Sequence, residues 1–154
     1  MKFVKILFLL AVAIVLSSCS KDEEPFDHPF IYIADAQGGS SAVIDCDGTF
    51  VATYYVYMST KIAEDVTVDY ELVVGDGLQE GVDFRQVSSG SSIVFPSGVY
   101  ERPIRIEWLN HMIEAGKNNT VKIVLKSNSK NFTIGFPGPD HLNSEYTITK
   151  QIPF

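Results

Sequence analysis

The amino-acid sequence predicts an all-β protein, specifically a two-sheet antiparallel β-sandwich with Greek-key connections. Apolar and polar residues alternate along several short segments, as they do in strands that bury one face. Stretches rich in glycine, serine and proline separate these segments at the spacing of strands in a sandwich. No segment keeps a helical period beyond about two turns, so long helices are not expected.

Two short strands are expected at the start of the folded part. Residues 30–33 are β-branched and aromatic, a composition that favours a strand. After a loop of glycines and serines, residues 42–46 form the next short run. The turn at Asp47-Gly48 closes this second strand, because Asp-Gly pairs favour tight hairpin turns.

Residues 49–58 give the strongest strand signal. One face of this strand carries Phe50, Ala52, Tyr54, Val56 and Met58, and we expect that face to lie in the core. Tyr55 and Tyr57 lie on the opposite face and are expected to point outward. Residues 66–73 alternate in the same way, which is typical of a half-buried antiparallel strand.

Four more strands are expected at 93–95, 104–108, 120–126 and 145–150. Trp108 shares its phase with Ile104 and Ile106, which predicts that its indole lies in the core. Residues 109–115 could form a short helix ending at Gly116. Seven or eight strands in one domain spanning 29–154 are therefore expected.

The middle of the chain carries motifs in a recognisable order: Gly81-Val82-Asp83-Phe84, Ile93-Val94-Phe95-Pro96-Ser97-Gly98, Ile104-Arg105-Ile106 and Val121-Lys122-Ile123-Val124-Leu125. This order resembles that of Calx-beta domains over roughly residues 50–150. The chain is most similar to the Calx-beta-like, Ig-like domains of small Bacteroidetes surface lipoproteins, whose function is largely unassigned. The resemblance implies an Ig-like sandwich and no particular activity, since function is grafted onto such folds.

The resemblance also raises the question of calcium. Calx-beta domains that bind calcium use acidic clusters at one end of the sandwich, including acids just before the penultimate strand. Here that position reads Lys117-Asn118-Asn119, with Glu114 as the nearest acid. Calcium prefers six to eight oxygen ligands, several of them carboxylates. We therefore predict no cofactor, and the acids that would be calcium ligands if separate loops converged are Asp45, Asp47, Glu64, Asp65 and Asp83.

Residues 1–18 have the pattern of a secretory signal peptide. Two lysines precede an apolar run at 6–16, and small residues stand before Cys19. The run is shorter than the ~20 apolar residues of a membrane-spanning helix. Leu16-Ser17-Ser18-Cys19 resembles a bacterial lipobox, which implies lipidation at Cys19 and anchoring by several acyl chains. The alternative is an ordinary cleaved signal with a chance cysteine.

Residues 19–28 are predicted to form a lipidated acidic tether. Lys21-Asp22-Glu23 resembles the export signal that sends Bacteroidetes lipoproteins through the outer membrane to the cell surface. Charge and Pro25 would also give a solvated, disordered tether without any export signal. We predict an outer-membrane, lipid-anchored protein that faces the cell exterior.

Composition and side-chain spacing argue against several classes of function. The net charge of −7 disfavours binding to nucleic acid, which needs clustered basic residues. If Cys19 carries lipid, Cys46 has no partner and is expected to be a buried, inert thiol. The histidines, His28, His111 and His141, lie far apart and are expected at the surface or in turns. No nucleophile or phosphate-binding motif occurs, so we predict that the protein is not an enzyme.

The remaining hypothesis is a binding module. Tyr55, Tyr57 and Tyr100 are the candidate ligand-contact residues, because aromatic rings offer contact area at low entropy cost. A protein partner or an adhesive contact is favoured. The alternatives are a glycan-binding accessory lipoprotein of a polysaccharide-uptake system and a tethered spacer without a ligand.

Overall fold

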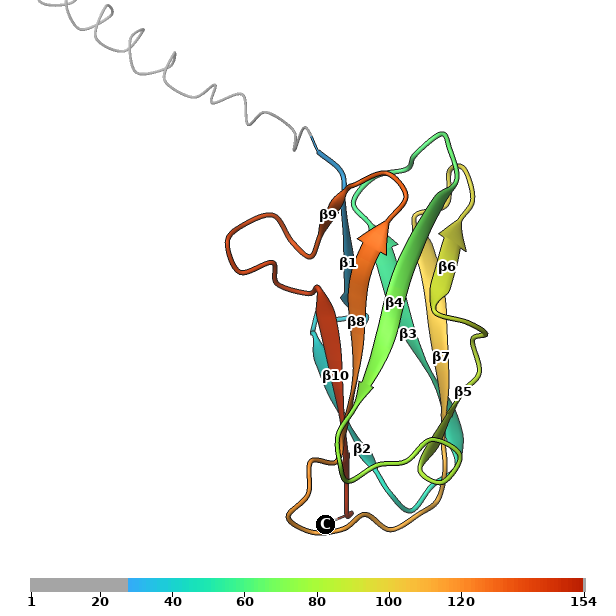
Figure 1. Ribbon diagram of the computed structural model, residues 1–154, viewed down its shortest axis with the longest axis vertical. Helices are drawn as coiled ribbons and strands as arrows, with labels where there is room; N and C mark the ends of the chain where they lie inside the picture. The colour runs from blue at the N-terminus through green and yellow to red at the C-terminus, as the bar shows by residue number, and fades with distance from the viewer. Residues whose placement is uncertain (1–27, 154) are drawn as a thin grey trace, which may run out of the picture.

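A computed structural model describes residues 28–153, and within this range the chain forms two facing β-sheets and no helix (Figure 1). Accordingly, this part of the chain contains no helix long and apolar enough to cross a membrane. The predictions for residues 1–18, for Cys19 and for Lys21-Asp22-Glu23 lie outside the described residues.

The first sheet has the strand order β5-β7-β3-β1-β9. Its strands in that order are β5 (Phe84–Gln86), β7 (Glu101–Trp108), β3 (Phe50–Met58), β1 (Phe30–Ala34) and β9 (Thr133–Ile134). β1 and β9 run parallel, and the other neighbours in this sheet run antiparallel.

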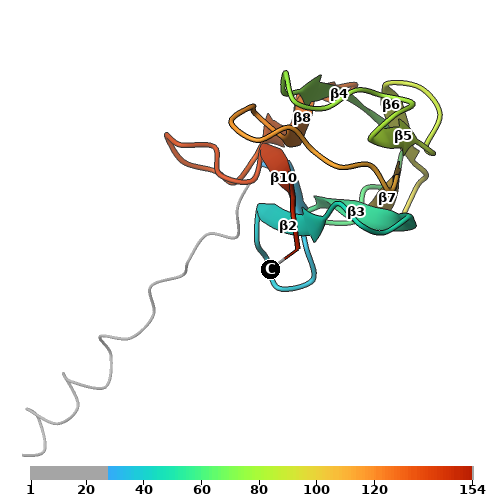
Figure 2. The same cartoon turned by 90° about the horizontal axis from the view of Figure 1, so that it is seen from below.

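The second sheet has the order β2-β10-β8-β4-β6. Its strands in that order are β2 (Ser41–Asp45), β10 (Glu145–Gln151), β8 (Thr120–Asn128), β4 (Val66–Val74) and β6 (Ser92–Phe95). Only β2 and β10 pair in parallel. The predicted two-sheet, mostly antiparallel sandwich is therefore confirmed, and Figure 2 shows β5, β6 and β7 together along one side of it.

The core lies between the sheets and contains several aromatic residues, among them Trp108, which the alternation predicted to be there. Trp108, Phe84 and Phe95 are fully buried. The Trp108 indole Nε1 donates a hydrogen bond to the Tyr54 hydroxyl at 3.1 Å. Burial raises the pKa of Tyr54 to about 12, with the Trp108 hydrogen bond acting against the rise and the charge of Tyr146 adding to it. This hydrogen bond satisfies the polar atoms of two aromatic side chains inside an apolar core.

Two predictions about local structure are wrong. Residues 109–115 form an extended loop between β7 and β8, because the backbone N–H groups of Leu109 and His111 donate to the carbonyls of Asp83 and Cys46 and not to a helical turn. Phe50 is 41% exposed, although Trp108 opposite it on β7 is fully buried, because β1 pairs only with residues 55–58 of β3 and leaves one side of Phe50 without a neighbouring strand. In addition, the short strands β5 and β9 were not predicted, because a strand of only two or three residues is too short to show an alternation of apolar and polar residues.

Candidate functional site

Aromatic rings gather on the outer face of the first sheet. We call this group the aromatic strip, and it consists of Phe30, Tyr32, Tyr55, Tyr57 and Phe136. Two of the rings come from β1, two come from β3, and the last follows β9. All five side chains are partly exposed.

The rings of the strip contact one another in sequence. Tyr55 lies 6.1 Å from Tyr57, and Tyr57 stacks on Tyr32 with ring centroids 5.3 Å apart and planes inclined by 24°. Phe136 lies 4.8 Å from Tyr32 and 5.8 Å from Phe30. Such offset and tilted contacts are the favourable geometries for aromatic pairs.

Strand register and one glycine create the strip. Tyr32 of β1 is directly opposite Tyr57 of β3, so two outward tyrosines from distant segments become neighbours. Phe136 is brought to them by Gly135, whose N–H donates to the Ile31 carbonyl at 2.7 Å. Gly135 has φ +80, and an added Cβ would lie 2.3 Å from the His141 carbonyl oxygen. A larger residue there would displace Phe136.

Carboxylates flank the strip. Glu101 of β7 is opposite Tyr57, and Asp35 follows β1. The pKa of Tyr57 is raised by burial and then by the nearby charges of Glu101, Tyr32, Tyr55 and Asp35. The strip therefore combines apolar ring area with a negative surrounding, which suits a cationic and apolar partner surface.

Of the three predicted contact residues, Tyr55 and Tyr57 come together, whereas Tyr100 stands apart. Tyr100 is 48% exposed, and the Lys61 ammonium lies 5.6 Å above its ring. The ring contacts that connect the strip do not include it. Sequence periodicity identified the two outward tyrosines of β3, but it gave no means of adding Phe30, Tyr32 or Phe136 to them.

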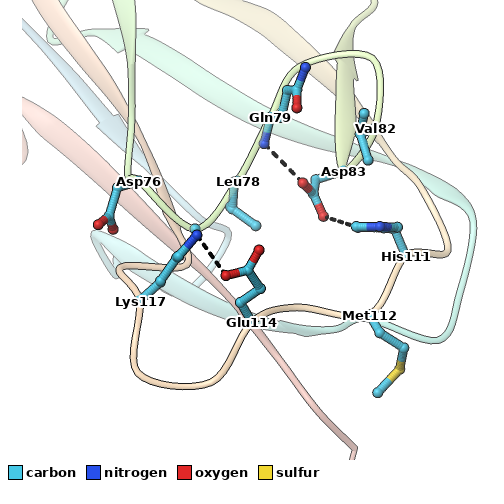
Figure 3. A pocket seen from close by; sticks show the side chains of 10 residues that line it. Asp76, Leu78, Gln79, Val82, Asp83, His111, Met112, Glu114 and Lys117 are labelled. Atoms are coloured by element: carbon cyan, nitrogen blue, oxygen red, sulfur yellow. Dashed lines mark hydrogen bonds and ion pairs between the residues drawn. The ribbon is translucent and has the colours of Figure 1, made fainter.

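A second candidate region lies at the end of the sandwich where the β4–β5 and β7–β8 loops meet. A cavity of about 340 Å³ opens there, and Figure 3 shows Asp83 and His111 on one side of it and Glu114 and Lys117 on the other. Its lining is largely polar. We call this region the loop end.

Asp83 is the centre of the loop end and is only 3% exposed. Its Oδ1 accepts a hydrogen bond from the Lys150 ammonium at 3.0 Å and lies 2.9 Å from His111 Nδ1. Its Oδ2 accepts from the Gln79 N–H at 2.9 Å. Burial by itself would raise the pKa of this carboxyl, but the hydrogen bonds from His111, Gln79 and Lys150, together with the Lys150 charge, outweigh it and lower the pKa.

Lys150 is fully buried, which is unusual for a lysine. Its ammonium also donates to the Leu109 carbonyl at 3.0 Å, so it connects β10 to both loops. Sequence reasoning missed Lys150. It placed His111 at the surface or in a turn, and His111 is exposed in the β7–β8 loop, but its contact with Asp83 was not foreseen. A signal was available for the lysine, because Lys150 falls in the inward phase of Tyr146 and Ile148 on β10.

The other calcium candidates do not join Asp83. Asp45 accepts a hydrogen bond from the Gln151 side chain at 3.1 Å, and Asp47 is exposed in the β2–β3 turn. Glu64 pairs with Lys130, and the Asp65 carboxylate accepts from the Ser97 N–H at 2.9 Å. Within residues 28–153, no group of three or more His, Cys, Asp or Glu side chains is placed to hold a metal ion.

Cys46, the remaining candidate from the sequence, is fully buried, as predicted. Its Sγ lies 3.6 Å from the Met112 sulfur, a contact between two soft, polarisable atoms. The contact helps to hold the β7–β8 loop against the end of β2.

Comparison with known proteins gives a fold but no family assignment. A scan against protein-family models finds no match, and a search of curated proteins finds no similar sequence. Among solved structures, the apo-form Calx CBD1 domain matches with a TM-score of 0.57 at 20% identity, over 81% of this chain and 99% of that one. The domain has a Calx-beta-like fold.

Two further structures share the fold over a similar part of this chain. The calcium binding domain CBD12 of CALX1.1 matches with a TM-score of 0.56 at 20% identity, over 80% of this chain and 44% of that one. A structural-genomics protein of unknown function from Bacteroides ovatus matches with a TM-score of 0.53 at 8% identity, over 80% of this chain and 47% of that one. Thus 81% of this chain matches nearly the whole of the CBD1 domain, and 80% of it matches less than half of each of the two longer chains.

The CALX1.1 structure is described as a calcium binding domain. The side chains at the loop end of this chain do not suit a calcium ion. Asp83 is paired with Lys150, and Glu114 is paired with Lys117 at 2.6 Å. A calcium ion would have to displace a buried ammonium that already neutralises the central carboxylate. The donor set therefore suits an internal ion pair and not a divalent cation.

Proposed function

We propose that this protein is a bacterial cell-surface lipoprotein whose Calx-beta-like, Ig-like domain is a non-catalytic interaction module that binds another protein through the aromatic strip. The strip supports this proposal because its five partly exposed rings lie on the outer face of the first sheet. The core is built from other aromatic residues, so these rings are not needed to fill it. Tyrosine is enriched at protein interfaces for its large, rigid contact area.

The chemistry of the strip favours a partner surface that carries arginine or lysine among apolar residues. Tyrosine rings attract cations over their faces, and the carboxylates of Glu101 and Asp35 next to them add Coulomb attraction. An acidic or nucleic-acid partner would be repelled by the same groups.

A glycan-binding accessory lipoprotein is the alternative. Sugars stack on exposed, coplanar rings, and Tyr32 and Tyr57 are nearly parallel. However, these two rings stack on each other, and the other contacts are inclined by 35° to 74°. A strip of mutually inclined rings fits the uneven side chains of a protein better than the flat face of a sugar.

The aromatic strip can be tested by site-specific photo-crosslinking in intact cells. We expect a photoreactive phenylalanine at Tyr57 to capture a protein of defined mass. We expect Tyr55→Ala in the same chain to reduce its yield by about fivefold, since a tyrosine that is a hot spot of an interface contributes about 1 kcal/mol or more. The matched control is the same photoreactive residue at Tyr100, outside the strip. Equal capture from both positions would contradict the proposal, and retention of the protein on polysaccharide columns would favour the glycan alternative.

The membrane anchor is tested separately. We expect labelled fatty acid to be incorporated at Cys19, and we expect Cys19→Ser to release the protein from the membrane fraction. Replacement of Lys21-Asp22-Glu23 by alanines should keep the lipid and lose accessibility to protease added to intact cells. An acylated, protease-resistant wild type would contradict surface exposure while leaving the anchor in place.

A further inference from the structure

Nearly every lysine and arginine within residues 28–153 has a partner. The basic residues that form ion pairs with carboxylates are Arg85, Lys117, Lys122, Lys126, Lys130 and Lys150. Lys61 lies over the Tyr100 ring. Within this part of the chain, three cations have no carboxylate within ion-pair distance, namely Lys61, Arg102 and Arg105, and of these only the two arginines also have no aromatic ring beneath them.

Both of these arginines line one cavity of about 370 Å³. It lies between β6 of the second sheet and β7 of the first sheet, along the side of the sandwich that Figure 2 shows. β5 pairs with β7 only at residues 106–108, so the edge of β7 from Arg102 to Ile104 is uncovered by another strand. Pro103 at this edge has no N–H that could pair with a further strand.

Arg102, which lines this cavity, has an unsatisfied hydrogen-bond donor. Its Nε is buried and has no hydrogen-bond partner among the described residues. A buried N–H without an acceptor is unfavourable, and a guanidinium has five such donors in a planar fork. The chain as a whole has a net charge of −7, so two unpaired arginines at one place are not a consequence of general basicity.

The opposite wall of the cavity is made by the β5–β6 loop, and that loop is held in place. The Gln86 side-chain amide donates to the Tyr70 hydroxyl at 2.8 Å and to the carbonyls of Ser88 and Gly90 at 2.7 and 2.6 Å. The Ser88 hydroxyl oxygen accepts from the Arg105 N–H at 2.8 Å. Its own proton therefore remains available to donate into the cavity.

We propose that the cavity between β6 and β7, the arginine pocket, binds an oxyanion group, namely a carboxylate or sulfate carried by a sugar or another small molecule. Arg102 and Arg105 supply charge-assisted hydrogen bonds, for which the guanidinium fork matches both groups. Ser88 supplies a neutral donor from a wall that is already ordered. The cavity volume lies within the usual range for a small-molecule site, about 300–1,000 Å³.

The arginine pocket is tested by NMR titration of the ¹⁵N-labelled full chain in uncharged detergent micelles. D-Glucuronate, inorganic sulfate and uncharged methyl glucoside are added separately at constant ionic strength. We expect glucuronate or sulfate to shift the Nε–H signals of Arg102 and Arg105 and the amide signals of residues 88–92 in a saturable manner, and methyl glucoside to leave them unchanged. Tighter binding of glucuronate than of sulfate would identify a sugar acid, and the reverse would identify a bare oxyanion site.

Matched variants separate specific binding from general charge. Arg102→Gln and Arg105→Gln should each weaken binding by about tenfold, whereas Arg85→Gln, which removes an arginine already paired with Glu107, should leave it unchanged. Arg102→Lys keeps the charge and packing but lacks the fork, so it should bind less tightly than the wild type. Shifts that sodium chloride reproduces, or an equal loss in Arg85→Gln, would overturn the proposal.

Discussion

The loop end and the arginine pocket place basic residues in opposite situations. At the loop end, the buried Lys150 ammonium is matched by the Asp83 carboxylate and the Leu109 carbonyl. In the arginine pocket, the buried Nε of Arg102 has no acceptor among the described residues. A charge whose partners are internal holds segments of the fold together, whereas a charge whose partner is missing is available to a ligand. The two regions should therefore respond differently to the same kind of substitution.

The largest expected effect is on stability when the buried pair is broken. Lys150→Met should lower the free energy of unfolding by about 3–5 kcal/mol, because it leaves the Asp83 carboxylate buried without its cation. Denaturant unfolding followed by the fluorescence of the single tryptophan, Trp108, measures this change. The control is Lys126→Met, which removes an ion pair with Glu71 that is about half exposed and should lower stability by at most about 1 kcal/mol. Equal losses in both variants would remove the distinction between the regions.

Acid should weaken the loop end selectively. The pKa of Asp83 is lower in the folded chain than its ordinary value of 3.8, so this residue stabilises the fold above that pH and the contribution is lost as pH falls through the folded pKa. We expect the wild type to lose stability more steeply than Asp83→Asn below about pH 4. Unfolding midpoints measured from pH 7 to pH 2 for both proteins give the two slopes. Parallel slopes would show that Asp83 does not titrate in the expected direction.

A smaller loss of stability is expected when the β5–β6 loop, which forms one wall of the arginine pocket, loses the hydrogen bonds that order it. Gln86→Ala removes the hydrogen bonds from the amide to the β5–β6 loop and should lower stability by about 1 kcal/mol. Hydrogen exchange of residues 87–91 should accelerate while exchange in β8 stays slow. Unchanged exchange in the loop would mean that Gln86 does not order it.

The smallest expected change follows replacement of the unpaired arginines. Arg102→Gln and Arg105→Gln together should change the free energy of unfolding by less than about 1 kcal/mol, since neither residue has an internal ion-pair partner within residues 28–153. The same unfolding assay used for Lys150→Met checks this. A loss as large as that of Lys150→Met would assign the arginines to the fold and not to a ligand.

Calcium provides a further comparison within the loop end. Because Lys150 already neutralises Asp83, millimolar calcium and a calcium chelator should give the wild type the same thermal unfolding midpoint. A midpoint that rises with calcium would show that the acids rearrange to bind the ion. Magnesium at the same concentration controls for ionic strength.

The strands of the sandwich were predictable because the alternation of apolar residues is a local property of the chain. The inward positions of Trp108, Ile104 and Ile106 followed from a period of two, and all three are buried. The helix predicted at 109–115 was wrong because the backbone of that segment bonds to Asp83 and Cys46, which are distant in sequence. Local patterns contain no information about such partners.

By itself, the sequence determined most of the residues that face the core and that two sheets must cover each other, although Phe50 was placed there wrongly. Only the tertiary structure decided which outward or buried polar residues meet. Lys150 reaches Asp83 across 67 residues of chain, and Tyr32 reaches Tyr57 through the register of β1 and β3. The physical reason is that the alternation along a strand fixes only the face of the sheet on which each side chain lies. Which side chains become neighbours on that face depends on strand order and register, and these are set by the packing of the whole chain.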